Sequence, residues 1–509
     1  MNQQNNVLHT GNLDCKYILN PCYILRTDIN RVIFTQTGNP HYHKLGNNNF
    51  TSFIHPTHAI MLTFFNGDKT LNEALLEVSQ FFDISRDTAL NILIKFIENK
   101  DRLVVEYDDN LFYFPQKVLI RHDNNYPVRT YSVDDFYIDG ELCFSTQRFN
   151  IPIEANLLIN NRCLTDCIYC YADKRQIHDC TIPFERLKEI IKEAKMLGFR
   201  NFDIQGGELF LYEYWYELLQ ELIKAEFFVE LSTKVPLQKK QIKSLLDLNY
   251  KKIQISLDSI FSEDLETNLR VNKSYCERMI NSITDLDQAG FAIKLKPVIT
   301  GRIFNISKLK SYIDFFKQYK NIKTIEITAP GHSFFKSQDD FFSYRLSLDQ
   351  IDQIKKLVSK EKESCNFELR ADVNGEENLA VLALSEKTDK WNKRAVCLGN
   401  LSSFLILPNG DITFCEEAYF NKKLVLGNIL NNSIMEVWGS SMAKNMFYTP
   451  KDIFPKESAC SRCTEFEDCR HTGGICWVDI VGHYGDENFL FPDPRCPLAP
   501  PVSLITYYS

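Results

Sequence analysis

Apolar side chains recur at helical spacing in the first hundred residues. In residues 70–82 they stand at Leu71, Ala74, Leu75, Val78 and Phe82. This period predicts a helix with one buried face, and Ser85 can cap a second helix over residues 86–99. Runs rich in branched and aromatic residues come earlier and predict three strands, at residues 22–26, 32–36 and 50–54. The pattern therefore predicts a small strand-and-helix domain over residues 1–108.

The pattern changes twice further along the chain. Asp108, Asp109 and Asn110 introduce a polar, turn-rich stretch, so residues 109–150 are predicted to be a linker. From residue 154, strand-like runs alternate with helical ones. The strand-like runs are residues 154–159, 201–205, 228–233, 253–257, 293–299 and 324–328. Such alternation predicts parallel strands joined by crossover helices.

The predicted fold class is therefore α/β, with a partial (β/α)6 barrel of the TIM type over residues 151–345. A bridging region is predicted at residues 346–389, and residues 390–509 read as a loop-rich, cysteine-rich domain. Chemistry in such barrels is expected at the carboxyl ends of the strands. These are the positions of Cys163, Gly206, Thr233 and Asp258.

Composition and charge narrow the functional classes. The chain has 509 residues, of which 44% are hydrophobic and 24% charged, as in a globular multidomain protein. Its formal net charge of -8 and its lack of a polybasic run argue against nucleic-acid binding and against binding to an anionic membrane. We find no signal-peptide pattern and no apolar stretch of membrane-spanning length, which predicts a cytoplasmic location.

Sixteen cysteines change this picture, because the cytosol keeps thiols reduced and large domains do not need disulfides. Cys163, Cys167 and Cys170 lie in one loop directly after the first predicted barrel strand. Three thiolates leave one iron of a four-iron cluster open to another molecule, whereas a closed structural zinc site has four protein ligands. On spacing alone, a zinc site that borrows a fourth ligand stays the alternative.

The spacing of these cysteines, with Tyr169 before the third, resembles the loop of the radical S-adenosylmethionine superfamily. Other residues at strand ends fit the resemblance, although Leu209 stands where proline is usual and Ser259 where glycine is frequent. The resemblance implies a [4Fe-4S] cluster on the three cysteines and a bound S-adenosylmethionine. The cofactor would contact Tyr169, Gly206, Gly207, Glu208, Thr233, Ser256, Asp258 and Arg270.

Seven further cysteines between residues 397 and 496 resemble the SPASM extension of that superfamily, which carries two auxiliary clusters. Three [4Fe-4S] clusters are thus implied. One auxiliary cluster would take Cys460, Cys463, Cys469 and Cys496, and the other Cys397, Cys415 and Cys476. The second set either recruits Cys365 as its fourth ligand or leaves an iron open. For Cys460 and Cys463 alone, a zinc ribbon is the alternative.

Glu416 directly follows Cys415, and in sulfatase-maturing relatives an acidic residue at this point serves as a base. Glu416 is therefore the candidate catalytic base. The first hundred residues resemble the winged-helix-like peptide-recognition element of maturases of ribosomally made peptides. That resemblance implies a leader peptide that adds a strand near residues 50–54, against residues 86–99. A DNA-binding winged helix is the alternative, which the acidic residues of this segment disfavour.

Taken together, the resemblances imply an oxidoreductase that modifies a ribosomal precursor peptide, as the sactipeptide and ranthipeptide thioether synthases do. A cysteine thioether crosslink is the leading hypothesis, and a carbon-carbon or carbon-oxygen crosslink is the nearest alternative. A reducing protein such as flavodoxin or ferredoxin would supply the electron. A non-catalytic iron-sulfur electron carrier or a zinc-binding interaction protein would need the cysteines, but not Glu208, Asp258 or Arg270.

Overall fold

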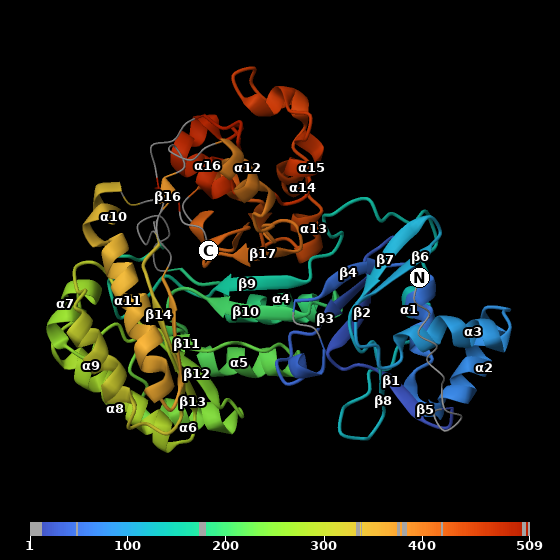
Figure 1. Cartoon of the computed structure of the whole chain (residues 1–509), viewed down its shortest axis with the longest axis horizontal. Coiled ribbons are helices and arrows are strands. Elements are labelled where there is room, and N and C mark those ends of the chain that lie inside the picture. The colour runs from blue at the N-terminus through green and yellow to red at the C-terminus, as the bar shows by residue number, and fades with distance from the viewer. Residues whose placement is uncertain are drawn as a thin grey trace. The chain divides into compact units, whose positions relative to one another are not determined.

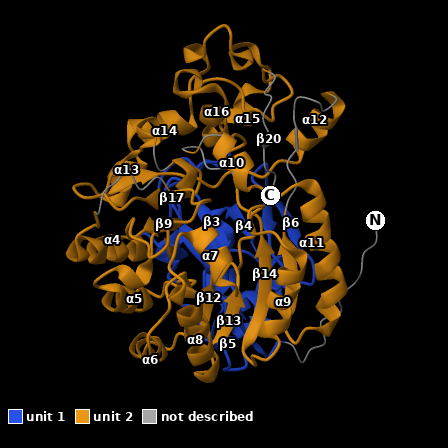
Figure 2. Ribbon diagram, turned by 90° about the vertical axis from the view of Figure 1, so that its left-hand side faces the viewer, with its two compact units in different colours: residues 1–153, 197–201 blue, residues 154–196, 202–509 orange. Residues whose placement is uncertain are grey.

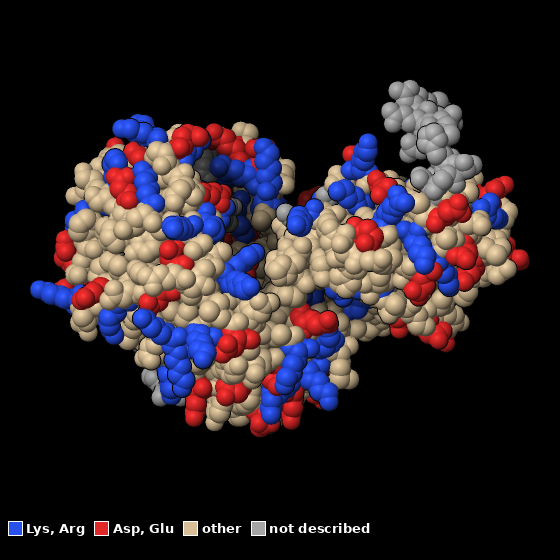
Figure 3. All heavy atoms as spheres, turned by 90° about the horizontal axis from the view of Figure 1, so that it is seen from below, with Lys and Arg blue, Asp and Glu red and all other residues tan. Residues whose placement is uncertain are grey.

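The structure is a computed structural model that describes residues 13–46, 49–172, 180–331, 336, 338–373, 377–378, 384–418, 421–500 and 505–506. The first residues, whose sequence lacks a signal-peptide pattern, lie outside this range. Two compact units make up the chain (Figure 2): residues 1–153 with 197–201, and residues 154–196 with 202–509. No helix in the described ranges is long and apolar enough to cross a bilayer. On the face drawn in Figure 3, Lys and Arg side chains are interspersed with Asp and Glu.

Short antiparallel sheets and three helices build the first unit (Figure 1). One sheet has the order β2 (Tyr23–Thr27), β3 (Val32–Gln36), β4 (Thr51–Ile54). Another has the order β5 (Asn66–Thr70), β1 (Lys16–Leu19), β8 (Leu119–Arg121). A hairpin joins β6 (Leu103–Tyr107) to β7 (Asn110–Phe114). The helices are α1 (Pro56–Thr63), α2 (Leu71–Phe81) and α3 (Arg86–Leu93). The three strands and the helix predicted over residues 70–82 are confirmed, whereas the helix predicted over residues 86–99 ends at Leu93 and continues as a 3-10 turn over Ile94–Phe96.

Side-chain caps explain where α2 and α3 begin. The Thr70 hydroxyl accepts from the amide of Glu73 at 3.3 Å, and the Glu73 carboxylate accepts from the amide of Thr70 at 2.8 Å. This reciprocal capping box satisfies two amides that a helix terminus leaves without partners. Ser85 caps α3 by accepting from the amide of Thr88 at 3.1 Å.

Part of the stretch predicted as a linker belongs to the core of the first unit. Asp108 and Asp109 both have positive φ, 51° and 57°, and form the two-residue turn between β6 and β7. Such a turn matches the right-handed twist of its flanking strands. Phe112 and Phe114, which follow it, are buried. The structure therefore differs from the prediction because polar turn residues mark a hairpin here, and not the end of a domain.

A five-stranded parallel sheet forms the centre of the second unit. Its order is β11 (Ser232–Thr233), β12 (Lys252–Ile255), β13 (Ala292–Leu295), β14 (Ile322–Thr328), β15 (Glu368–Asp372). Figure 1 shows helices along its outer side. They are α6 (Lys239–Asp247), α8 (Ser274–Gln288), α9 (Ile306–Phe316) and α11 (Leu348–Glu361). Buried Ile and Leu side chains of β13 and β14 fill the layer between strands and helices.

A second sheet brings the cysteine-rich region onto the same framework. Its order is β10 (Asn201–Gln205), β9 (Glu154–Leu158), β17 (Ser403–Ile406), β18 (Asp411–Thr413), β19 (Gly427–Asn428). β17 pairs in parallel with β9, with Phe404 opposite Ala155. Residues far apart in sequence are thereby fixed next to each other.

All six predicted barrel strands are present, as β9 to β14. They form two hydrogen-bonded groups and not one continuous ladder, and β11, at the edge of the second group, is only two residues long. β15 comes from the predicted bridging region and extends the parallel sheet. The structure is therefore of the α/β class, and β15 and β17 pair in parallel with the barrel strands β14 and β9.

Candidate functional site

A glycine turn after β10 lies against the end of β9. Gly207 has a φ of 58°, and a Cβ at this position would lie 2.1 Å from the carbonyl oxygen of Asn160. Only glycine fits there. The Asn160 side chain donates to the carbonyl of Glu208 at 3.0 Å and accepts from the amide of Glu208 at 3.2 Å. Asn160, which the sequence did not single out, therefore fastens the predicted Gly206-Gly207-Glu208 motif to the first strand.

The Glu208 carboxylate is buried and receives donors from the next strand end. Its Oε2 accepts from the Thr233 hydroxyl at 2.9 Å and from the amide of Lys234 at 3.2 Å. Its Oε1 accepts from the amide of Phe210 at 3.2 Å. Burial raises the pKa of Glu208, and these hydrogen bonds oppose the rise. The structure thus brings together two predicted site residues, Glu208 and Thr233.

A buried network joins the three-cysteine loop to the ends of β11 and β12. The Tyr169 hydroxyl donates to Asp258 Oδ2 at 2.5 Å, and Lys234 Nζ donates both to Asp258 Oδ1 at 3.2 Å and to the Tyr169 hydroxyl. Asp258 Oδ1 also accepts from the amide of Val298, after β13, at 3.2 Å. Burial lowers the pKa of Lys234, but Asp258, Cys167 and Cys170 together outweigh the effect of burial, and the net pKa is raised. Lys234 is a second residue that sequence reasoning missed.

Backbone hydrogen bonds hold the three-cysteine loop beside the C-terminal end of α7 (Ser262–Leu269). The amides of Asp166 and Ile168 donate to the carbonyls of Leu269 and Asn268, each at 2.9 Å. Arg270, in the left-handed conformation, donates to the Asp166 carboxylate at 2.8 Å. The predicted residue Arg270 therefore lies next to the loop. Ser256 is buried below it, and its amide donates to the carbonyl of Thr233 at 3.0 Å.

Tyr171 follows Cys170 in the chain and interacts electrostatically with the acidic pair after Cys415. A Cβ on Gly206 would lie 3.3 Å from its hydroxyl. Burial raises the pKa of Tyr171, and Glu416, Cys170, Glu417 and Cys163 raise it further. The predicted base Glu416 is therefore close to the three-cysteine loop, although 246 positions separate Glu416 from Cys170.

Glu417, next to the predicted base, has the more unusual environment. Its Oε2 is shielded from solvent and accepts no hydrogen bond within the described part of the chain. Burial raises its pKa to about 8, with further contributions from Glu416 and Asp479. The sequence of the pair Glu416–Glu417 does not indicate which of the two carboxylates is buried. The structure therefore adds Glu417 to the acidic candidates.

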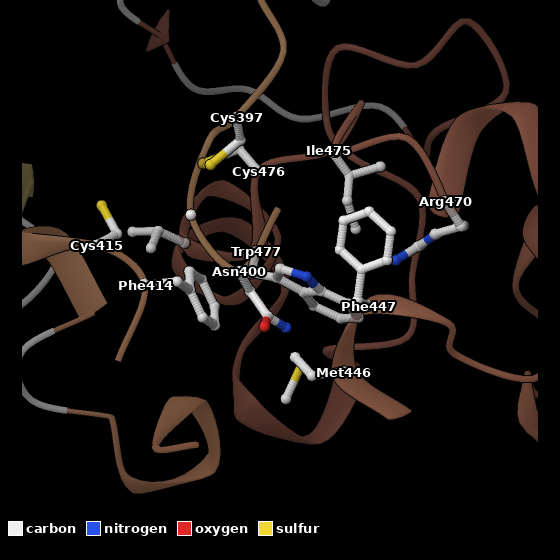
Figure 4. A pocket seen from close by; sticks show the side chains of 13 residues that line it. Cys397, Asn400, Phe414, Cys415, Met446, Phe447, Arg470, Ile475, Cys476 and Trp477 are labelled. Atoms are coloured by element: carbon white, nitrogen blue, oxygen red, sulfur yellow. The ribbon is translucent and has the colours of Figure 1, made fainter. Parts of the chain in front are cut away.

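Cys397, Cys415 and Cys476 line one cavity together with Phe414, Phe447 and Trp477 (Figure 4). The amide of Cys397 donates to the carbonyl of Gly473 at 2.9 Å, and the amide of Cys476 donates to Asp493 Oδ2 at 2.7 Å. The three cysteines predicted as one ligand set are thus brought to the same place.

The other distal set also converges. Burial raises the thiol pKa values of Cys469 and Cys496 to about 11 each, and Cys460 contributes to both shifts. Cys463 donates its amide to the carbonyl of Cys460 at 3.3 Å. Arg470, from α15 (Phe466–Arg470), donates to Cys460 Sγ at 3.2 Å. Cys365 lies elsewhere, between α11 and β15, where its thiol donates to the carbonyl of Glu361 at 3.3 Å.

These residues fit iron-sulfur clusters and S-adenosylmethionine. The first loop offers three thiols, the nearby glycine turn has no room for a Cβ, and the distal thiols form two separate sets. No three Cys, His, Asp or Glu side chains within the described ranges are spaced for one metal ion. A four-iron cluster differs in its demands, because each thiolate binds a different iron.

Two segments of the chain match known families. Residues 157–316 match the radical SAM superfamily, and residues 397–464 match SPASM, an iron-sulfur cluster-binding domain. The first match contains the cysteine loop, the glycine turn and the Lys234 network. The second begins at Cys397.

Two known proteins are similar over most of the chain. The antilisterial bacteriocin subtilosin biosynthesis protein AlbA of Bacillus subtilis is 23% identical over 323 residues, which are 62% of this chain and 66% of AlbA. The mycofactocin maturase MftC of Mycobacterium tuberculosis is 26% identical over 355 residues, which are 68% of this chain and 83% of MftC.

Solved structures of SuiB from Streptococcus suis have a similar fold. SuiB bound to its precursor peptide SuiA superposes with a TM-score of 0.58 and 14% identity, covering 94% of this chain and 99% of SuiB. SuiB bound to S-adenosylmethionine superposes with a TM-score of 0.60 and 15% identity over the same fractions. The likeness extends beyond the segments that match the two families.

Proposed function

Because residues 157–316 belong to the radical SAM superfamily and residues 397–464 to the SPASM family, we propose that this chain is an enzyme that modifies a ribosomally made precursor peptide. Its cofactors are S-adenosylmethionine and [4Fe-4S] clusters. The observation that carries the proposal is the hydrogen-bonded site at the strand ends, where Tyr169 of the three-cysteine loop binds Asp258 and Glu208 binds Thr233. The printed names of AlbA, MftC and SuiB support a peptide as substrate.

The proposal assigns three clusters. Cys163, Cys167 and Cys170 hold the cluster that binds S-adenosylmethionine. Cys460, Cys463, Cys469 and Cys496 hold one auxiliary cluster, and Cys397, Cys415 and Cys476 hold the other. Raised thiol pKa values in the distal sets mean that loading must displace protons, because thiolates are the ligands.

The chain's own residues position the cofactor and exclude water. Bound S-adenosylmethionine supplies, after one-electron reduction, a carbon radical that takes a hydrogen atom from the substrate. Gly206 and Gly207 would let the backbone approach the methionine part, and Glu208 would accept from its amino group. Arg270 would pair with its carboxylate, while Thr233, Ser256, Asp258 and Tyr169 would line the nucleoside side. Buried hydrogen bonds fix several of these groups before the cofactor binds, which reduces the cost of ordering them.

We assign the first unit to recognition of the leader peptide. The order α1, β5, α2, α3 and the β6–β7 hairpin supports the proposal of a winged-helix-like recognition domain. In the described sheet β4 is an end strand that hydrogen-bonds with β3, and β7 packs close to it. The proposed leader would add its strand at the end of this sheet. A tethered leader would keep the core peptide at high local concentration near the cofactor.

A cysteine thioether is the proposed bond. Cys365 does not lie with Cys397, Cys415 and Cys476, which supports an auxiliary iron that is open to a substrate thiolate. The peptide would lose two hydrogens: one atom leaves with the cofactor's radical, and the thiol proton passes to an acidic residue such as Glu416. The remaining electron passes to an auxiliary cluster.

Mass spectrometry of the precursor after anaerobic reaction tests this proposal. A thioether predicts a loss of two hydrogens together with one cysteine that no longer reacts with an alkylating reagent. A loss of two hydrogens with all cysteines still alkylated would instead establish a carbon-carbon or carbon-oxygen crosslink.

An electron carrier or a zinc-binding interaction protein is the proposal's rival from another functional class. Reconstituted protein with S-adenosylmethionine and dithionite, or with flavodoxin or ferredoxin as reductant, distinguishes them. Formation of 5'-deoxyadenosine is expected only if the protein is an enzyme that cleaves S-adenosylmethionine. Its absence from protein that carries a full complement of iron would contradict the proposed function.

A further inference from the structure

Lys234 places a positive charge beside the proposed cofactor site. Neither the sequence motifs nor the family resemblance predicted a charged residue at this position. It follows Thr233 at the end of β11, and its side chain is 22% exposed. Its amide donates to Glu208 Oε2 at 3.2 Å, and its carbonyl accepts from the Tyr275 hydroxyl at 2.7 Å. Both ends of its backbone are therefore fixed, and the direction of its side chain is set.

The Lys234 ammonium contacts one residue of the three-cysteine loop, Tyr169. Lys234 Nζ contacts the hydroxyl of Tyr169, lies 5.0 Å from the centre of its ring, and lies 3.2 Å from Asp258 Oδ1. Tyr169 stands between Cys167 and Cys170 in the chain. The charge of Lys234 also interacts with both thiols.

We propose that Lys234 is a positioning residue which holds Tyr169 against Asp258 and makes the cluster on Cys163, Cys167 and Cys170 easier to reduce. The inference rests on the proposed assignment of that cluster. Reduction adds one negative charge to the cluster, and a nearby cation stabilises that charge. The effect is strong where protein excludes water, and cluster potentials follow local charge and hydrogen bonding.

The sign of the effect separates this role from a purely structural one. Removing the ammonium takes away a positive charge near the cluster and leaves the Asp258 carboxylate without its counter-charge. Both effects disfavour reduction of the cluster. Removing the carboxylate instead leaves the ammonium alone, which favours reduction. A residue that only fills space would give no such opposite pair.

The test is a redox titration of the full chain with all three clusters and without S-adenosylmethionine, followed by electron paramagnetic resonance. Subtracting the spectrum of a variant with Cys163, Cys167 and Cys170 all changed to Ala isolates the signal of the first cluster. We compare Lys234→Met, Lys234→Arg and Asp258→Asn. Lys239→Met is the control, because Lys239 is 86% exposed and its loss changes the net charge equally.

At a fixed potential, Lys234→Met should lower the ratio of reduced to oxidised first cluster about tenfold, which is about 59 mV for one electron. Lys234→Arg should restore the ratio, Asp258→Asn should raise it, and Lys239→Met should leave it unchanged. A ratio in Lys234→Met equal to that of the unchanged chain overturns the inference. If Lys234→Met fails to bind iron, the Asp258→Asn variant decides. A lowered ratio of reduced to oxidised first cluster in that variant overturns the inference.

These results are distinguishable from a failure of the proposed function. A shifted ratio in a protein that makes no 5'-deoxyadenosine would keep the role of Lys234 and contradict the enzyme. A weaker affinity for S-adenosylmethionine with no shift of the ratio would make Lys234 a cofactor contact and overturn the inference.

Discussion

The two cysteine-bearing regions of this chain are organised in different ways. In the first, three cysteines fall within eight consecutive residues, and a parallel sheet with its buried hydrogen bonds lies directly beneath them. In the second, seven cysteines spread over 100 residues, among short helices and turns. Sequence adjacency gathers the first set, whereas tertiary structure gathers the second.

This difference indicates where each region obtains its stability. The loop of Cys163, Cys167 and Cys170 inherits its position from strand ends that fold without iron. The distal region has few long elements, so its clusters should contribute folding free energy directly, as structural metals do in small domains. Loss of iron or of one ligand should therefore affect the two regions differently.

The largest contrast is expected from single cysteine changes. Cys167→Ala should reduce 5'-deoxyadenosine to background, because the cofactor's cluster has no other proposed ligands in the chain. Cys469→Ala should keep cofactor cleavage within about tenfold, or about 1.4 kcal/mol of barrier, while it abolishes the crosslinked peptide. Mass spectrometry measures both products in one reaction.

Cys365→Ala is the matched control, since Cys365 lies apart from both sets. It should retain the iron content and both products. Equal loss of cofactor cleavage in the Cys167 and Cys469 variants would break the proposed division of labour.

Removal of iron should come next in size. Amide hydrogen exchange of chelator-treated protein should speed up about tenfold or more in residues 454–496, which lose their clusters, because local opening there costs less free energy. Amides in β12, β13 and β14 should keep their protection. Uniform loss of protection in both regions would show that the sheet also depends on iron.

A pair of glycines allows a matched comparison by substitution. Gly207 and Gly473 both have positive φ, 58° and 73°, and an added Cβ would meet the carbonyl oxygens of Asn160 at 2.1 Å and Cys397 at 2.6 Å. Gly207→Ala should weaken binding of S-adenosylmethionine about tenfold or more and leave auxiliary iron in place. Gly473→Ala should do the reverse. Equilibrium binding and iron content measure these effects.

Gly290→Ala separates backbone strain from collision. Gly290 has a φ of 79° but an added Cβ would meet nothing within 4 Å. It should therefore cost only about 1–2 kcal/mol of unfolding free energy and change neither binding nor iron. If Gly290→Ala and Gly207→Ala lost cofactor binding equally, a general loss of stability would explain the weaker binding of both variants.

Much of the first region could be predicted from sequence, because its signals are local. Three closely spaced cysteines and a glycine pair after a strand are visible in a single line of residues. Asn160 and Lys234 are not, since an asparagine and a lysine at strand ends carry no signal until the strands are aligned. The buried contacts of Lys234 with Tyr169 and Asp258 exist only in three dimensions.

The distal region was less predictable for the same reason. The resemblance to the SPASM extension implied two ligand sets, but it did not imply that β17 pairs with β9 or that Glu416 interacts with Tyr171, next to Cys170. Glu416 and Glu417 begin a 3-10 turn, in which neighbouring side chains point in directions about 120° apart. Which acid is buried therefore depends on that turn's orientation and not on the residue type.

The smallest expected effect concerns the exposed ion pair of the first loop. Arg270 and Asp166 are 64% and 62% exposed, so Asp166→Asn should change the unfolding free energy by about 0.5 kcal/mol or less. The backbone bonds from Asp166 and Ile168 to residues 268–269 remain, and they should keep the loop and its iron in place. Denaturant unfolding and iron analysis measure both. A loss of iron in Asp166→Asn would show that the loop is held by its surface charge, and the contrast with the distal region would then be weaker than the strand-end contacts imply.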